Sequence, residues 1–314
     1  MAKVLITGGA GFIGRHVVRQ FLAHGWQVVV LDVDEFGEPE LEHTANFSAI
    51  QGDINSKQDL REAMHACDAV VHLAALVSVP QSIEEPEKTM AVNVDGTRNV
   101  LQCALEGNMS NVVVASSAAV YGSFPDMPLV ESTPVECLSP YAKSKATNEA
   151  DVVAFRKKGL NAIALRFFNI YGPGQRSDSS YASLIPIFVH TMKRGKRPTI
   201  HGSGEQTRDF VHVRDLARAV YRMVARVKPY EHPVANVASE TQISVLDVVQ
   251  CINHCLYEHA GMVAIVPLHG DAREGDVMHS CGSAERIRKM IDWKAEISFE
   301  KGVGSLLENN EERR

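Results

Sequence analysis

"KVLITGGAGFIG", residues 3–14, runs from an apolar segment of strand type into a glycine-rich turn and then into a helix-forming sequence. Its glycines stand at positions 8, 11 and 14. Gly8 permits a tight turn, Gly11 lets backbone N–H groups approach a pyrophosphate, and Gly14 brings the helix close to the strand. A plain tight turn has much the same glycine pattern, so its interpretation as a dinucleotide-binding turn depends on the context.

The sequence around the turn supports the dinucleotide interpretation. A strand precedes it, a helix follows it, and Asp32 closes the next apolar run, "VVVLD". A carboxylate at this point accepts hydrogen bonds from the two adenosine ribose hydroxyls and repels a 2′-phosphate. The pattern therefore favours NAD over NADP as the cofactor. The alternative is that Asp32 is an ordinary solvated acid at the end of a strand.

Further apolar runs continue along the chain, with helical patterns between them. They are continuous in Val, Ile and Leu, as strands covered by helices on both faces require. The sequence therefore predicts the α/β class and a Rossmann-type, doubly wound parallel sheet. After about residue 170 the predicted helices lengthen and the strands shorten, which indicates a smaller, interleaved C-terminal lobe. The runs are "WQVVVLD" at 26–32, "DAVVHLAA" at 68–75, "NVVVASS" at 111–117 and "LNAIALRF" at 160–167.

The composition argues against several other classes of protein. The 314 residues include 32 basic and 38 acidic side chains, a net charge of −6, whereas a nucleic-acid partner usually requires a basic face. No signal-peptide pattern begins the chain, and no apolar run reaches membrane-spanning length. The six cysteines lack the spacing of a disulfide scaffold, so we expect reduced thiols and a cytoplasmic protein.

One group of cysteine and histidine residues could suggest a metal site. Cys251, Cys255 and His259 recur at helical i, i+4, i+8 spacing in and after "CINHC". Cys is also a common buried apolar residue, and no second ligand pair follows at zinc-finger spacing. We interpret these three residues as part of a helix core and expect no metal.

"SPYAKSKATNEA", residues 139–150, places Tyr141 four positions before Lys145 in a segment that reads as helix. Residues at i and i+4 share one helical face, so both side chains can point into one site. An unperturbed tyrosine titrates near pH ~10 and is a poor base at neutrality. A neighbouring ammonium and a positively charged nicotinamide ring would both favour the phenolate. The alternative is an ordinary packing pair.

With the glycine turn, this pair and "NVDGTRNVL" at 93–101 on one chain, the sequence resembles the extended short-chain dehydrogenase/reductases. Within that family it looks most like the nucleotide-sugar 4-epimerases of the UDP-galactose epimerase type. The resemblance extends nearly from end to end, and the ordered set of motifs makes it specific. The further motifs are "GDIN", "HLAA", "SSAAVYG" at 116–122, "RFFNIYGPGQ" at 166–175, "QTRDFVHVRD" at 206–215 and "REGDV" at 273–277.

The resemblance implies two sets of contacts. For NAD they are Gly8, Gly11, Phe12, Ile13, Gly14, Asp32, Asp53, Ile54, Leu73, Ala74, Ala75, Asn93, Tyr141 and Lys145, with Asp53 and Ile54 beside the adenine. For the substrate they are Ser117, Asn169, Arg208, Arg273 and Ser280, with the two arginines on the diphosphate. A net-acidic protein that binds a dianion must supply local cations, which supports the arginines. Their alternative is a surface ion pair.

The resemblance also implies the catalytic roles. Tyr141 takes the proton of the sugar 4-hydroxyl while C4 passes a hydride to NAD⁺. Lys145 holds the cofactor ribose and lowers the pKa of the tyrosine, and Ser117 hydrogen-bonds the reacting oxygen. Because the hydride returns to the sugar, NAD should remain tightly bound.

Two alanines narrow the expected reaction. Relatives that eliminate water carry an acidic pair after the serine, whereas this chain has Ala118 and Ala119, whose methyl groups cannot act as acid or base. We therefore expect a UDP-glucose/UDP-galactose 4-epimerase. Ser280 stands where a bulky aromatic would exclude N-acetyl sugars, so UDP-GlcNAc/UDP-GalNAc is a second expected pair. The alternatives are a uronic-sugar 4-epimerase, a 4,6-dehydratase, a reductase, or a catalytically idle NAD-binding scaffold.

The resemblance also suggests how the chain is organised. Residues 1–169 and 205–239 should form the NAD-binding domain, and residues 170–204 and 240–314 the sugar-nucleotide-binding lobe. A homodimer through the helices near 86–106 and 139–158 is expected by analogy.

Four more residues keep two interpretations. Tyr121 and Tyr171 precede glycines and either line the sugar pocket or pack in the core. His201 and His212 flank the nucleotide-binding segment and either contact the ligand or belong to loops and strand ends.

Overall fold

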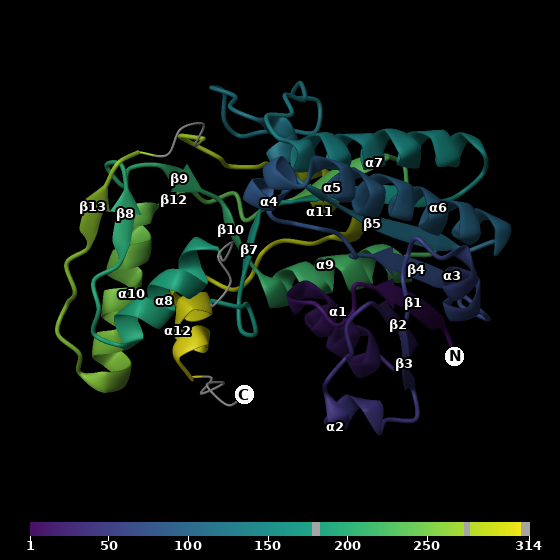
Figure 1. Cartoon of the computed structure of the whole chain (residues 1–314), viewed down its shortest axis with the longest axis horizontal. Helices are drawn as coiled ribbons and strands as arrows, with labels where there is room; N and C mark the ends of the chain where they lie inside the picture. The colour runs from purple at the N-terminus through teal and green to yellow at the C-terminus, as the bar shows by residue number, and fades with distance from the viewer. Residues whose placement is uncertain (178–182, 273–276, 309–314) are drawn as a thin grey trace.

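The computed structural model of the chain describes residues 1–177, 183–272 and 277–308, and contains a sheet of seven parallel strands (Figure 1). The predicted Rossmann-type α/β class is confirmed, because helices cover both faces of this sheet. In spatial order the strands are β11 (Val234–Val237), β6 (Ala162–Phe167), β5 (Asn111–Ser117), β4 (Ala69–His72), β1 (Lys3–Thr7), β2 (Gln27–Asp32) and β3 (Phe47–Gln51).

The strand order reverses at β1. Its last residue, Thr7, pairs in register with Leu31 of β2 on one side and with His72 of β4 on the other. In open parallel sheets, ligands bind in the crevice outside the carboxyl ends of the strands where the order reverses. The glycine-rich turn follows Thr7 at this point.

Alternate residues of the strands enter two different cores. Val4 and Ile6 pack on the face that carries α1 (Phe12–Ala23), α9 (Val213–Ala225) and α11 (Glu285–Ile291). Leu5 packs on the other face, beneath α3 (Lys57–Ala63), α6 (Thr97–Glu106) and α7 (Pro140–Lys157). Burial on both faces explains why the strands are continuously apolar. The shorter elements are α2 (Pro39–Glu42), α4 (Val79–Glu84), α5 (Pro86–Met90), η1 (Ala91–Gly96) and η2 (Ala118–Tyr121).

A third hydrophobic core lies beside the sheet, on the left of Figure 1. It joins α8 (Leu184–Lys193), α10 (Val245–Ala260) and α12 (Phe299–Glu308) to β8 (Thr199–His201), which pairs with β13 (Leu268–Gly270). Two more small sheets complete the fold. They pair β7 (Asn169–Tyr171) with β10 (Phe210–His212), and β9 (Thr207–Arg208) with β12 (Ile243–Ser244).

The two-lobe division of the chain remains a proposal. The third core fits a separate lobe, but Ala284, Ile287 and Trp293 pack in the core of the sheet with α9. The sequence division places these residues in the sugar-nucleotide lobe, whereas α11 contacts β11 and α9. The chain therefore returns to the sheet once more near its C-terminus.

Candidate active site

The turn after β1 is shaped to approach a ligand through its backbone. Gly8 has a φ of +72°, and a Cβ there would lie 2.5 Å from the backbone nitrogen of Ala74. A Cβ at Gly14 would lie closer than 3.0 Å to the Gly8 carbonyl oxygen. Phe12 and Ile13 begin α1, whose N-terminus is capped by no side chain of the described residues. Backbone N–H groups and the positive end of the helix dipole can therefore face an anion.

Two more glycines belong to this turn. Gly11 is the N-cap of α1, and a Cβ there would lie 3.3 Å from the Gly8 carbonyl oxygen. Gly9, which the sequence analysis did not single out, is held more tightly. A Cβ at Gly9 would lie 2.6 Å from both Cγ atoms of Val30 on β2. The double glycine of "TGG" is the signal for this close approach of turn and strand.

Asp32 lies at the end of β2 and also shapes the turn. Its Oδ2 accepts a hydrogen bond of 2.9 Å from the N–H of Ala10, and its Oδ1 accepts one of 3.2 Å from Asp34. The carboxylate is half-buried, so it can support the turn and still reach a ribose. The next expected contacts lie after β3. Asp53 Oδ1 accepts from the Asn55 N–H at 2.9 Å, and the Ile54 side chain is buried, which leaves its backbone for an adenine.

Asn93 supports the cofactor side of the site indirectly. The side chain is fully buried in η1, a π-helical turn, and its amide brackets Leu76. Asn93 Oδ1 accepts from the Leu76 N–H at 2.8 Å, while Nδ2 donates to the Leu76 carbonyl at 2.9 Å. Leu76 continues the loop in which residues 73–75 stand half-buried at the end of β4. Asn93 therefore fixes the loop that was expected to line the nicotinamide ribose.

Ser117, Tyr141 and Lys145 meet at the end of β5. The Lys145 ammonium donates to the Ala115 carbonyl at 2.9 Å, and its Nζ lies 5.8 Å from the centroid of the Tyr141 ring. The Ser117 hydroxyl is hydrogen-bonded to Tyr141 and also accepts from the Ala119 N–H at 3.1 Å. The structure thus brings together the three residues assigned to catalysis, with Lys145 held against the strand.

Burial dominates the electrostatics of this group. Burial raises the pKa of Tyr141 above its ordinary value, and the hydrogen bond with Ser117 lowers it only in part. Burial also lowers the pKa of Lys145 to about 8. Desolvation of the phenolate is thus the main cause of the raised pKa of Tyr141 in the protein by itself. The role of Lys145 in lowering the pKa of Tyr141 stays a prediction for the NAD-bound protein.

A buried ion pair lies behind the catalytic group. Glu149 Oε2 is 2.7 Å from Arg166 Nη2, and Glu149 Oε1 accepts a 2.6 Å bond from the Ser116 hydroxyl. Glu149 is eight residues after Tyr141 on α7, so one face of the helix carries Tyr141, Lys145 and Glu149. The helix therefore holds consecutive residues of β5. The sequence analysis missed this pair, because Glu149 lies in a helix of ordinary helix formers.

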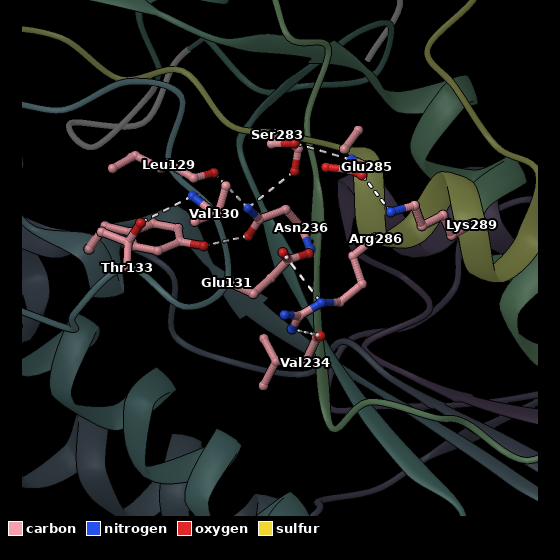
Figure 2. Close-up of polar contacts among 12 residues, drawn as sticks. Leu129, Val130, Glu131, Thr133, Val234, Asn236, Ser283, Glu285, Arg286 and Lys289 are labelled. Atoms are coloured by element: carbon pink, nitrogen blue, oxygen red, sulfur yellow. Dashed lines mark hydrogen bonds and ion pairs between the residues drawn. The ribbon is translucent and has the colours of Figure 1, made fainter.

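A second polar network anchors the long connection between η2 and α7 (Figure 2). Tyr121 donates to Asn236 Oδ1 at 2.7 Å, and Asn236 Nδ2 donates to the Leu129 carbonyl at 3.0 Å. Glu131 Oε1 accepts from the Asn236 N–H at 2.8 Å, and its other oxygen lies 3.4 Å from Arg286 Nε. This connection leaves η2, which begins directly after Ser117, and enters α7 one residue before Tyr141. Its attachment to β11 therefore holds the segment that joins the two catalytic elements.

The expected sugar-nucleotide residues meet at Thr207. Its carbonyl accepts from Arg208 Nη1 at 2.8 Å and from the Ser280 N–H at 3.1 Å. Asn169 Nδ2 donates to the Asp209 carbonyl at 3.1 Å, two residues after Thr207. The chain thus brings Asn169, Arg208 and Ser280 to one region. Arg273 lies outside the described residues.

Asp209 organises this region, and the sequence analysis missed it. It is fully buried, and burial raises the pKa of its carboxyl group. The carboxylate accepts from the backbone N–H groups of Ser239, Glu240 and Gly282 at 2.7, 3.1 and 3.2 Å. Two distant segments, one at 239–240 and one at 282, are thereby tied beside β9 and β10. In the sequence, the only sign of this residue is that an acid stands between Arg208 and Phe210 in "RDF".

A cavity of about 320 Å³ lies between α8 and β8. Its wall includes apolar side chains of α8 and the strand edge Pro198–His201, with Gln206 at one side. Gln206 Nε2 donates to the His201 carbonyl at 2.8 Å. This cavity was not predicted, because it forms between segments that are separate in the sequence.

The structure separates the residues that had two interpretations. Tyr121 and Tyr171 are buried, and the Tyr171 hydroxyl donates to the Phe299 carbonyl at 3.3 Å, so both pack in the core. His212 is also buried, with its Nδ1 accepting from the Arg214 N–H at 3.3 Å. His201 lines the cavity instead.

Cys255 and His259 on α10 contact backbone carbonyls of α12 and of α10 itself. Cys255 is buried in the third core, and its thiol lies 3.8 Å from the Glu300 carbonyl. His259 Nδ1 is 2.8 Å from the Cys255 carbonyl, four residues earlier. Among the described residues, no group of three or more His, Cys, Asp or Glu side chains could hold a metal ion.

Comparison with known proteins gives a consistent result. The sequence model of the NAD dependent epimerase/dehydratase family matches residues 4–238. The chain is 31% identical to the UDP-N-acetyl-alpha-D-glucosaminuronate decarboxylase of Bacillus cytotoxicus, over 98% of this chain and 97% of that protein. Among solved structures, the UDP-N-acetylglucosamine 4-epimerase of Methanobrevibacter ruminantium M1, in complex with UDP-N-acetylmuramic acid, superposes with a TM-score of 0.90. Its sequence is 33% identical, with 98% of this chain and 97% of that chain covered.

A second solved structure was determined with a cofactor. MoeE5 in complex with UDP-glucuronic acid and NAD superposes with a TM-score of 0.87 and is 32% identical. The superposition covers 98% of both chains.

Proposed function

This chain belongs to the NAD dependent epimerase/dehydratase family, and we propose that within it the protein is a nucleotide-sugar 4-epimerase. Its substrates are UDP-glucose and UDP-galactose, and their N-acetyl counterparts are a second pair. The observation that carries the proposal is the meeting of Ser117, Tyr141 and Lys145 at the end of β5, with Ala118 and Ala119 beside them.

NAD is the cofactor, and the residues of the turn fit it. Gly8 and Gly14 leave no room for a Cβ, and within the described ranges no side chain caps the N-terminus of α1. Asp32, which is bonded to the N–H of Ala10 in the same turn, would accept from a ribose. When bound, NAD⁺ supplies a hydride acceptor for C4 of the sugar and a positive charge that favours the phenolate of Tyr141. Lys145 would hold the nicotinamide ribose.

The side chains of this group suit a reversible oxidation at C4. Tyr141, as phenolate, takes the proton of the sugar 4-hydroxyl as the C4–H and O–H bonds break and the C4 ketone forms. The Ser117 hydroxyl holds the same oxygen. After the 4-keto sugar has rotated in the site, Tyr141 returns the proton to the C4 oxygen, and the product is the opposite epimer. No NAD is consumed in the complete cycle.

The residues next to Ser117 oppose a dehydration. Elimination of water requires an acid and a base beside C5 and C6, and methyl groups at Ala118 and Ala119 supply neither. The similarity to a uronic-sugar decarboxylase supports a second candidate, a uronic-sugar enzyme that begins with the same oxidation at C4. Reductase and idle-scaffold alternatives have less support, because Asp32 disfavours NADPH and the catalytic group is complete.

The cavity between α8 and β8 suits the nucleoside of the substrate. In the parallel pair of β8 and β13, the Pro198 carbonyl and the Gly202 N–H bond to β13. The N–H and C=O groups of Thr199 and His201 therefore point to the other edge of β8, on the side of the cavity. A strand edge offers N–H donors and C=O acceptors, and the imide edge of uracil has both. Arg208, two residues after Gln206 of the cavity wall, would pair with the diphosphate, together with Arg273.

The lack of a bulky side chain at Ser280 supports the N-acetyl pair. Its backbone N–H is bonded to Thr207, which fixes the serine beside Arg208. A serine permits a larger C2 substituent without favouring it, so both pairs should be turned over.

Two further expectations stay proposals. A homodimer would use the outer faces of α6 and α7, which an ion pair of 2.9 Å between Arg98 and Asp151 already joins within one chain. A cytoplasmic location is supported by six free cysteines. Within the described ranges, no helix is long and apolar enough to span a membrane.

The test is product analysis with purified protein and a panel of UDP-sugars. The panel contains UDP-glucose, UDP-galactose, their N-acetyl forms, UDP-glucuronic acid and dTDP-glucose. We expect a C4 epimer from the first two pairs without added NAD. If UDP-glucuronic acid is the one sugar that reacts, and it loses CO₂, the result would support the uronic-sugar enzyme. If no sugar gives a product, the result would support the idle scaffold.

A further inference from the structure

A line of buried polar side chains joins the cofactor turn to the catalytic helix. The hydroxyl of Thr7, at the end of β1, lies 2.7 Å from His72 Nδ1. His72 Nε2 is 2.8 Å from the hydroxyl of Thr97, which in turn donates a 2.6 Å bond to the Asn93 carbonyl. All four residues are at most 2% exposed. None of these contacts is needed to build a parallel sheet.

The hydroxyl protons available along this line identify the tautomer of the His72 imidazole. A threonine hydroxyl carries one proton, and that of Thr97 is used on the Asn93 carbonyl. Thr97 can therefore only accept from His72, which places the ring proton on Nε2. Nδ1 is then an acceptor, and the Thr7 hydroxyl donates to it. In the neutral Nε2–H tautomer, both ring nitrogens and both threonine hydroxyl protons are hydrogen-bonded.

The charges around His72 oppose a second ring proton. Burial, and then the ammonium of Lys145, lower the pKa of His72 to about 3. A cationic imidazole would also compete with Lys145 for the same low-dielectric region. The histidine therefore connects two sides of the site without adding charge to it.

Asn93 carries the line onward to the catalytic tyrosine. Its Nδ2 donates to the Leu76 carbonyl at 2.9 Å and to the Ser144 hydroxyl at 3.1 Å. Ser144 in turn donates to the Tyr141 carbonyl at 2.7 Å. The π-helical turn that contains Asn93 is of a kind often found at functional sites. One amide thus sets the distance between the cofactor loop and the helix of the general base.

We propose that His72, as the neutral Nε2–H tautomer, and Thr97 are positioning residues that hold Asn93 between the cofactor loop and the Tyr141 helix. This inference rests on the proposed function, because it assigns a purpose to the fixed distance. A histidine that only fills the core would satisfy its own bonds without determining turnover. Positioning is different, since displacements of about 1 Å at reacting groups can cost about 10²-fold in rate.

The first test is nuclear magnetic resonance of protein labelled with ¹⁵N-histidine, with a His72→Gln variant to assign the signal. We expect the signal that the variant assigns to His72 to report a neutral ring with its proton on Nε2 at every pH from 6 to 8. A Nδ1–H tautomer or an imidazolium in that range would overturn the proposal. This measurement needs no sugar, so it stands even if no UDP-sugar is turned over, which would reject the proposed function instead.

The second test compares Thr97→Val, Thr97→Ser and the control Thr147→Val in the NAD-bound protein. Thr147 lies on α7, and its hydroxyl donates to the Lys143 carbonyl of the same helix at 2.8 Å. We expect Thr97→Val to lower kcat about 10-fold, with KM changed less than about 2-fold. Thr97→Ser should restore kcat, and Thr147→Val should match the wild type. Unchanged kcat per NAD-bound molecule in a folded Thr97→Val protein would overturn the positioning role.

Discussion

Tyr141 carries the proton chemistry, so its hydroxyl can be tested alone. Tyr141→Phe removes one oxygen from a ring that is 9% exposed and leaves the packing in place. We expect NAD content and thermal unfolding to stay near the wild-type values while kcat falls by about 10²-fold or more. Turnover assays on protein with measured NAD content would show this, and near-normal turnover would remove Tyr141 from the mechanism.

The neutrality of His72 has a consequence for stability in acid. The unfolded chain protonates this histidine below about pH 6.5, whereas the folded protein keeps it neutral down to about pH 3. The unfolded state therefore binds more protons in this window, so the free energy of unfolding should fall as the pH falls. The expected slope from this group is about 1.4 kcal/mol per pH unit.

Urea unfolding at pH 7, 6 and 5 measures that slope. His72→Gln should lose this part of the slope, whatever its stability at pH 7. His65→Gln, at an exposed position, should keep it. Equal slopes for the wild type and His72→Gln would mean that His72 is already charged in the folded protein or is not buried.

Ser280 offers a test of substrate selection at one position. Ser280→Tyr fills the space expected beside the C2 substituent, so kcat/KM for UDP-GlcNAc should fall about 10-fold or more, while that for UDP-glucose changes little. Steady-state kinetics with both sugars decides the matter. An equal loss for both sugars, or no wild-type activity on the N-acetyl sugar, would reject this role.

At the scale of elements, the close contact between the turn and α1 requires a glycine at position 14, where helix propensity alone would favour alanine. Alanine favours a helix interior over glycine by about 1 kcal/mol. At Gly14, however, the added Cβ would collide with the backbone of Gly8. We expect Gly14→Ala to lower both NAD retention and the melting temperature.

Gly304 of α12 serves as the control for that substitution. The nearest atom to a Cβ there lies 3.9 Å away, so Gly304→Ala should be neutral or stabilising, with NAD retained. Thermal unfolding and the cofactor absorbance of the purified proteins measure both effects. If Gly14→Ala also gained stability and kept its NAD, the close approach of helix and turn would not be required.

The elements also show what the sequence could and could not predict. Continuous apolar runs and the glycine turn predicted the parallel sheet, because both features are local. Asn236 and Glu131, by contrast, meet across 105 positions of sequence, and no local pattern indicates that they do. The raised pKa of Tyr141 was missed for a similar reason, since desolvation depends on the residues that surround it in space.

For the whole molecule, the site lies where separate units of the fold meet. The sheet supplies the turn, Asp32 and the catalytic group, and the segments around Thr207 supply Arg208 and Ser280. The cavity between α8 and β8 was not predicted, because its walls come from segments between positions 184 and 245. The family resemblance predicted the residues of the site, whereas the shape of this cavity required the structure.

The proposed reaction makes a specific claim about one hydrogen atom. In a 4-epimerase the hydrogen on C4 leaves as hydride and returns to the same carbon. Purified protein should therefore convert UDP-glucose deuterated at C4 into UDP-galactose that keeps its deuterium at C4, in ordinary water and without added NAD. Mass spectrometry and proton resonance of the product would show this directly. An epimer that has lost its deuterium, or a product lighter by one water, would contradict epimerisation by hydride return at this site.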